Sequence, residues 1–278
     1  MKISEGSKFI FIATSHDHIE DRFLYDINYG IGILKSRGVT DKNITVITDL
    51  VIGTWVEKYN NMATVKFRES AELNYVIENS ECDNLFIVSS CHGSMEGIDS
   101  KTPIKPFYLN QAIKKNKYAK NILVFLGQCY AGIFNFMDVR DDEKNIVYIG
   151  ATDINTSLSS MLNGCGWVAN ISVMALFKWL ENPRDVDGDG IFSITDLYKF
   201  VSCFTNNVTN QIEKMQTSRL IDASVSLRLE KMRLSGQGNT YMSQIVEEAI
   251  ETTIKKYNVP HQNTWMLNAI AAGNMNFE

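Results

Sequence analysis

Two segments of similar composition decide the fold of this chain: Asn84-Leu-Phe-Ile-Val-Ser-Ser90 and Asn121-Ile-Leu-Val-Phe-Leu-Gly127. Both are apolar at consecutive positions and rich in branched and aromatic residues, which is typical of strands buried on both faces of a parallel sheet. Three further runs, at 8–14, 43–48 and 145–150, have the same character. Together they predict an α/β domain with a mostly parallel sheet of about six strands, flanked by helices.

The segments between these runs have helical periodicity. From Asp21 to Arg37 the apolar residues fall on one helical face, and Gly38 follows where helices commonly stop. Further helices are predicted over 63–79, 107–117, 166–180, 197–234 and 241–257. A last apolar run, about 264–272, is predicted to return to the sheet as a strand.

Composition excludes several classes of protein. The 278 residues carry 27 basic and 32 acidic side chains, a formal net charge of −5, which gives no electrostatic support for nucleic-acid binding. No run of 18 apolar residues occurs, so no membrane span is predicted, and the polar segment 1–8 is not expected to be a signal peptide. Five cysteines without a CxxC pair argue against a disulfide framework and favour a reducing, cytoplasmic location.

The residues that follow the two quoted strands carry the most distinctive chemistry. His92-Gly93 comes after the first strand and Gln128-Cys129 after the second. Ligand sites in open parallel sheets lie beyond the carboxyl ends of the strands, so neighbouring strands would bring His92 and Cys129 to one edge. An imidazole beside a cysteine favours the nucleophilic thiolate. We therefore predict that Cys129 is a nucleophile with His92 as its acid–base partner.

Three neighbouring features bear on this prediction. Gly93 has no Cβ, so its N–H can approach a substrate carbonyl as an oxyanion donor. A helical-looking segment over 130–137 would begin directly after Cys129 and add the field of its N-terminus. Cys91 is a poor alternative nucleophile, because adjacent strand residues such as Cys91 and His92 point to opposite faces.

His-Gly after one strand, and Gln-Cys-x-x-Gly (128–132) after the next, resemble the caspase-like cysteine peptidases, the clan of caspases, metacaspases and legumains. The opening of the chain, a strand followed by a helix that carries Arg22 and by the turn Ser36–Val39, is similar to the legumain-like bacterial branch. The resemblance covers about 8–180 and rejoins at 259–272. Substrate preference is not carried over, because Gln128 stands where metacaspases have an acidic residue.

The resemblance implies a caspase-like cysteine endopeptidase, one domain over 1–278 with its core at 8–180, that acts on protein or peptide substrates. Cys129 would attack the scissile carbonyl to form a thioester acyl-enzyme, and His92 would protonate the leaving amine. The amides of Gly93 and Cys129 would stabilise the oxyanion, and no third catalytic partner is expected. A catalytically silent binding or scaffold module of the same fold is the alternative. A nucleotide-binding domain is disfavoured, because GxGxxG and Walker A sequences are missing.

Two residues are candidates for substrate binding, with opposite consequences. Arg22 stands where the legumain-like pattern has its pocket arginine and would favour Asn or Asp at P1, the substrate residue before the scissile bond. Asp153 follows the run 145–150 and would attract Lys or Arg. We slightly favour the basic preference, because Asp153 follows the strand expected beside that of Cys129. The alternatives are an exposed first-turn residue for Arg22 and a turn or cap residue for Asp153.

An acidic loop over 185–196 matches the calcium-loop template. Oxygen-bearing side chains occupy its positions 1, 3, 5, 9 and 12, Gly190 lies at the sharp turn, and position 7 offers a backbone carbonyl: the predicted ligands are Asp185, Asp187, Asp189, Ile191, Ser193 and Asp196. Position 12 is Asp, whose side chain is shorter than the usual Glu. We predict bound calcium, as a structural brace or an activator; the alternative is a solvated turn that caps the following helix.

The helical insert, about 204–257, is the part that a minimal peptidase domain explains least. It is a candidate contact for a regulatory partner or for a second copy of the chain. No cofactor is needed for the predicted chemistry itself.

Overall fold

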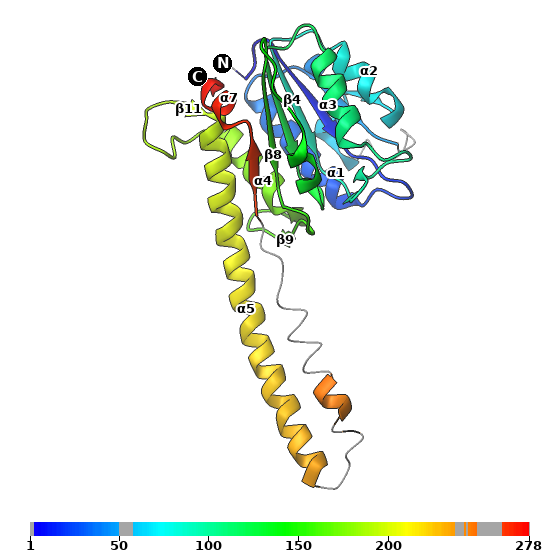
Figure 1. The fold of residues 1–278 in the computed structure, drawn as a ribbon, viewed down its shortest axis with the longest axis vertical. Helices are drawn as coiled ribbons and strands as arrows, with labels where there is room; N and C mark the ends of the chain where they lie inside the picture. The colour runs from blue at the N-terminus through cyan, green and yellow to red at the C-terminus, as the bar shows by residue number, and fades with distance from the viewer. Residues whose placement is uncertain (1–2, 50–57, 237–241, 243, 249–262, 278) are drawn as a thin grey trace. The chain divides into compact units, whose positions relative to one another are not determined.

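The computed structural model describes residues 3–49, 58–236, 242, 244–248 and 263–277, without the side chains of 212–224. Its central sheet has seven strands in the order β12-β8-β7-β4-β1-β2-β3, and all neighbours are parallel except β12, which runs antiparallel to β8 (Figure 1). The strands are β1 (Ser7–Ile12), β2 (Ile44–Ile47), β3 (Lys66–Arg68), β4 (Asn84–Ser89), β7 (Asn121–Leu126), β8 (Asn145–Gly150) and β12 (Trp265–Leu267). The predicted α/β class with a mostly parallel sheet is confirmed.

Helices cover both faces of this sheet (Figure 1). α1 (Asp21–Ser36) and α4 (Ile171–Glu181) pack on one face, whereas α2 (Leu73–Glu78) and α3 (Pro106–Lys115) pack on the other. The strand order reverses direction at β1, so right-handed crossovers require helices on opposite faces. Gly30 lets α1 approach α4 closely, because an added Cβ would lie 2.1 Å from the Phe177 ring.

Register at the amino edge of the sheet is fixed by a ladder of polar side chains. β4, β7 and β8 each begin with asparagine, and these residues lie opposite one another. Asn121 donates to Asn84 and Asn145 donates to Asn121, each over 2.9 Å. Asn84 in turn donates to Ser7 at the start of β1. A one-residue slip would break all of these bonds and turn the apolar residues to the wrong faces.

The five predicted strands are confirmed, but three other segments differ from expectation. The predicted helix 63–79 contains strand β3 before α2, because Lys66–Arg68 pairs with the edge strand β2. The predicted helix 166–180 begins with β10 (Val168–Asn170), which pairs with β9 (Ser159–Met161), so α4 starts only at Ile171. The predicted strand 264–272 ends at Leu267 and continues as α7 (Ala269–Asn274).

The chain divides into two compact units, residues 1–205 with 262–278, and residues 206–261. The first unit holds the sheet and every predicted site residue. The predicted helix 197–234 is confirmed by α5 (Ile194–Gly236), which begins in the first unit and continues into the second. The prediction for 241–257 falls largely outside the described residues. None of the helices in the described part of the chain combines the length and apolar character needed to cross a bilayer.

Candidate functional site

His92 and Cys129 follow neighbouring strands, as predicted. β4 and β7 pair in parallel with Ser89 opposite Leu126, so each of the two residues is the third after the last paired position of its strand. The two following segments touch, because a Cβ added to Gly93 would lie 2.4 Å from the carbonyl oxygen of Cys129. Only glycine permits this approach. The carboxyl edge of the sheet therefore brings the His92-Gly93 segment against the Cys129 backbone.

The chain turns sharply after Cys129. Tyr130 has a left-handed backbone conformation (φ 57°), which residues other than glycine adopt at a cost of roughly 1 kcal/mol. A 3-10 helix, η5 (Ala131–Phe136), follows it in place of the α-helix expected over 130–137. The predicted dipole contribution is correspondingly small, because fewer peptide units are aligned in two short turns. The Tyr130 N–H donates to the Asn155 carbonyl over 2.7 Å and holds the turn in place.

The loop after β8 wraps around the cysteine. The backbone N–H of Ser157 donates to the Cys129 sulfur over 3.3 Å. The sequence offered no signal for this contact, because a backbone donor has no residue type that marks it. This N–H is a ready partner for a negatively charged sulfur.

Asp153 lies in the same loop. Its carbonyl accepts from the Gly132 N–H over 3.3 Å, and a Cβ on Gly132 would lie 2.6 Å from Asp153 Oδ1. The side chain is exposed and takes part in none of the ion pairs found among the described residues. Asp153 thus offers a carboxylate with no cationic partner among the described residues, beside the segment that follows Cys129.

Glu20 is the residue that sequence reasoning missed. Its Oε1 lies 2.6 Å from His92 Nε2, and Phe23 packs edge-on against the imidazole with ring centroids 4.9 Å apart. An ionised carboxylate can only accept a hydrogen bond, so Nε2 carries the proton and Nδ1 is left to exchange one. Glu20 directly precedes α1, far from His92 in sequence, and nothing in its local pattern pointed to this contact.

Arg22 is tied to the same carboxylate. Its Nε donates to Glu20 Oε2 over 2.5 Å, and its Nη1 donates to the Ser159 hydroxyl over 2.7 Å. The hydrogen bond from Arg22, with the charges of Arg22 and His92, holds the pKa of Glu20 below its ordinary value despite partial burial. The structure thus places Arg22 at the His92 side of the site, with its positive charge already compensated.

Burial raises the thiol pKa of two other cysteines, Cys91 and Cys82. Cys91 is 3% exposed, and burial raises the pKa of its thiol to about 12. Burial also raises the pKa of Cys82, to about 11. Such thiols are neutral at physiological pH and are poor nucleophiles. This agrees with the sequence argument that set Cys91 aside.

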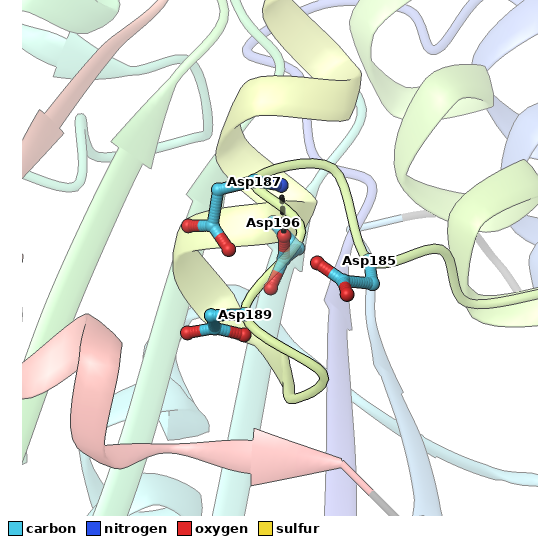
Figure 2. A group of neighbouring side chains, drawn as sticks. All are labelled: Asp185, Asp187, Asp189 and Asp196. Atoms are coloured by element: carbon cyan, nitrogen blue, oxygen red, sulfur yellow. Dashed lines mark hydrogen bonds between the residues drawn. The ribbon is translucent and has the colours of Figure 1, made fainter.

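The acidic loop gathers its four aspartates (Figure 2). One carboxylate oxygen from each of Asp185, Asp187, Asp189 and Asp196 lies within 4.8 Å of the others. Asp185 accepts from the Gly188 N–H over 2.6 Å and from the Gly190 N–H over 2.9 Å, and these bonds wind the loop. Gly190 has φ +82°, as the sharp turn of the template requires.

Two side chains of the loop, Asp196 and Ser193, make hydrogen bonds within the folded chain. Asp196 is fully buried and accepts from the Val186, Asp187 and Ser193 N–H groups. Burial alone would raise the pKa of Asp196, but these donors outweigh it and lower the pKa. The predicted ligand Ser193 uses its hydroxyl to donate to Asp196 over 2.9 Å.

The acidic loop is connected by strand pairing to a segment far along the chain. β11 (Phe192–Ser193), which follows the predicted ligand Ile191, pairs antiparallel with β13 (Asn276–Phe277). The Ile194 N–H, at the start of α5, donates to the Met275 carbonyl over 3.1 Å. The order of the loop and that of the C-terminal strand are therefore coupled.

Two cavities lie away from these sites. One, of about 380 Å³, is lined by residues that include Asp49, Ser70 and Lys101. The other, of about 770 Å³, lies between α3 and η5 and is lined by residues that include Phe107 and Phe136. No predicted site residue lines either cavity.

A comparison of the chain with models of known protein families and with curated proteins gives no match. Its function must therefore be inferred from its own residues and their geometry.

Proposed function

We propose that this protein is a caspase-like cysteine endopeptidase in which Cys129 is the nucleophile and His92 the general acid and base. One observation carries the proposal: the strands that precede His92 and Cys129 are hydrogen-bonded neighbours, and Gly93 packs against the Cys129 carbonyl. A histidine, a cysteine and a glycine amide then share the carboxyl edge of a parallel sheet, the usual place for a site in this fold class.

The proposed reaction has two steps. The Cys129 thiolate attacks the scissile carbonyl, the C–N bond breaks, and the leaving amine takes a proton from His92. Water then attacks the resulting thioester and gives a proton to His92. Collapse of the second tetrahedral intermediate breaks the C–S bond and releases the acid and the Cys129 thiolate. The amides of Gly93 and Cys129 donate to the oxyanion of both tetrahedral intermediates.

Glu20 extends the proposed dyad. Its carboxylate accepts from His92 Nε2, which fixes the ring and compensates the positive charge of the imidazolium. Arg22 holds the carboxylate from the other side. Glu20 is therefore proposed to orient His92 rather than to touch the substrate.

For substrate preference, we favour Lys or Arg at P1. Asp153 is exposed beside Gly132 and has no cationic partner in the described structure, whereas Arg22 is paired with Glu20 and bonded to Ser159. An uncompensated carboxylate attracts a basic side chain, and a compensated guanidinium attracts an acidic one only weakly.

The acidic loop is proposed to bind calcium as a structural brace. The donor set fits a hard cation, since four carboxylates converge and only Asp187 has a cationic partner among the described residues, Lys199 at 2.8 Å. A bound cation would relieve the repulsion among them. The pairing of β11 with β13 means that the brace would hold the C-terminal strand in place as well.

A panel of fluorogenic peptides that vary only at P1, assayed with and without calcium, tests the activity. We expect cleavage after Lys or Arg, no cleavage by Cys129→Ala, and labelling of Cys129 by an acyloxymethyl ketone peptide of the preferred sequence. Neither cleavage nor labelling of the intact protein by any member of the panel would favour the scaffold alternative. Labelling of Cys91 in place of Cys129 would overturn the assignment of the nucleophile.

A further inference from the structure

We propose that Asp26 is a positioning residue for the cysteine site: its buried carboxyl group joins the ends of β4 and β7 and so fixes the place of the His92 and Cys129 segments. The inference rests on the proposed function for its catalytic meaning. It goes beyond that function because Asp26 reaches neither the thiol nor the imidazole directly, and lies on α1 in the layer behind them.

Asp26 accepts three hydrogen bonds from elements far apart in sequence. The Ser90 hydroxyl donates to Oδ2 over 3.0 Å and the Asn170 backbone N–H donates to the same oxygen over 3.1 Å. The Trp167 indole N–H donates to Oδ1 over 2.7 Å. Ser90 is the residue after β4, two positions before His92. One carboxyl group therefore anchors the end of β4, the hairpin strand β10 and the start of α4.

Asn170 carries the connection on to the cysteine. Its side-chain amide donates to the Gly127 carbonyl over 2.7 Å and to the Ser157 hydroxyl over 3.2 Å. Gly127 lies two positions before Cys129, and the Ser157 N–H donates to the Cys129 sulfur. Asp26, Asn170 and Ser157 thus form a continuous path from α1 to the sulfur, in which every link is a hydrogen bond.

Burial of the Asp26 carboxyl group carries a desolvation cost, which argues that the group has a role. Asp26 is fully buried, and desolvation raises the pKa of its carboxyl to about 7 even though the three donors and the charge of Arg22 act in the opposite direction. An apolar residue would fill the same space without that penalty. It would leave the Trp167 and Asn170 N–H groups without an acceptor and the two strand ends without their common anchor.

Asp26→Asn keeps the shape but replaces one acceptor oxygen with an amide that donates, so at least one of the three donors loses its partner. Cys129 reactivity is measured as its iodoacetamide alkylation rate at pH 7, followed by mass spectrometry, with the exposed Cys203 as internal reference. We expect the Cys129 rate to fall several-fold relative to Cys203. We also expect kcat on the preferred peptide to fall roughly ten- to a hundredfold, with KM changed much less.

Asn116→Asp is the matched control. Asn116 is also fully buried and makes several hydrogen bonds, to the Ile77 and Ser80 carbonyls among others, but it precedes β7 at the amino edge. Both variants should lower the melting temperature, and only Asp26→Asn should slow Cys129. Equal loss in the control, or unchanged alkylation and kcat in Asp26→Asn, would overturn the proposal.

A second variant and a readout independent of peptide cleavage complete the test. If Asp26→Asn does not fold, Ser157→Ala removes a later link at a half-buried position, and unchanged Cys129 reactivity there would refute the path. If the intact protein cleaves no peptide, the endopeptidase proposal fails by itself, while the alkylation rates still decide whether Asp26 positions the thiol.

Discussion

The carboxyl edge of the sheet and the acidic loop 185–196 are both polar clusters, but they are assembled in different ways. The loop draws its four aspartates from twelve consecutive residues and winds them together by hydrogen bonds to its own backbone. The sheet edge draws Glu20, His92, Cys129 and Ser157 from four separate segments. Only the packing of α1 and the pairing of β4 with β7 bring these segments together.

This difference separates what a local pattern can specify from what a fold must specify. A loop motif carries its own spacing, so its oxygen positions follow from the sequence wherever the loop lies. A site on a sheet edge depends on which strands are neighbours and on which helix covers them. The two regions should therefore respond differently to substitution. The effects on activity run below from the largest to the smallest, and those on stability follow.

The largest effect should come from the dyad. We expect His92→Ala and Cys129→Ala each to reduce kcat/KM by roughly a thousandfold or more, and the double variant to lose little beyond either one, because the two groups act as a unit. Cys91→Ala should keep most of the activity, since burial holds that thiol neutral. Additive losses in a double-mutant cycle would show that the two strand ends do not form one site.

Glu20→Gln tests whether the edge includes the carboxylate that the sequence did not reveal. Loss of the charge at 2.6 Å from His92 should lower kcat roughly ten- to a hundredfold with a smaller change in KM. Glu96 is an exposed acidic residue on the turn between β5 (Gly93–Ser94) and β6 (Gly97–Ile98). Glu96→Gln is the control and should behave like the unaltered protein. Equal kcat values for the two variants would remove Glu20 from the mechanism.

Specificity should depend on Asp153 more than on Arg22. We expect Asp153→Asn to reduce the preference for Lys or Arg over Asn at P1 by roughly tenfold, measured as a ratio of kcat/KM values. Arg22→Ala should leave that ratio nearly unchanged, because Glu20 already compensates the guanidinium. A large change with Arg22→Ala and none with Asp153→Asn would reverse the assignment.

The acidic loop should affect stability rather than catalysis. Calcium at a hundredfold excess over its Kd should stabilise the folded form by about 2.7 kcal/mol, a rise of several degrees in Tm by calorimetry. Asp187→Ala and Asp189→Ala should abolish the rise, whereas Asp142→Ala, an exposed acidic residue outside the loop, should keep it. Cys129→Ala should also retain the full rise, because the two regions are separate. Absence of any calcium-dependent shift in the unaltered protein would favour the solvated turn.

The pH dependence that Asp26 confers on stability should be similar in size to the calcium effect. Its pKa is raised from 3.8 to about 7 in the folded protein, so its stabilising contribution is complete below about pH 4 and is lost as the pH rises through 7. The stability difference between the unaltered protein and Asp26→Asn should therefore fall by about 2–3 kcal/mol between pH 5 and pH 8. Urea denaturation at both pH values measures this. A difference that does not vary with pH would show that Asp26 does not titrate in this range.

Apolar patterning predicts much of the fold. The features that it does not predict are defined by contacts between residues far apart in the chain. The runs that form β1, β4, β7 and β8 are buried on both faces, and such runs have few alternatives. β3 could not be predicted, because Lys66-Phe67-Arg68 is a polar edge strand defined only by its pairing with β2. The periodicity predicts Asn170 inside a helix, whereas it is the N-cap of α4 and a link in the Asp26 network.

The sequence by itself determined the parallel sheet, the positions of His92-Gly93 and Cys129 each after a buried strand, and the six oxygen positions of the acidic loop, because burial periodicity and motif spacing are local properties. Only the tertiary structure decided that Glu20 meets His92 and that Asp26 and Asn170 join the two strand ends. It also decided that Arg22 is paired with Glu20, whereas Asp153 has no cationic partner in the described part of the chain. These contacts join residues far apart in the chain. Whether a carboxylate is paired, exposed or buried is a property of its neighbours in space, which no local pattern contains.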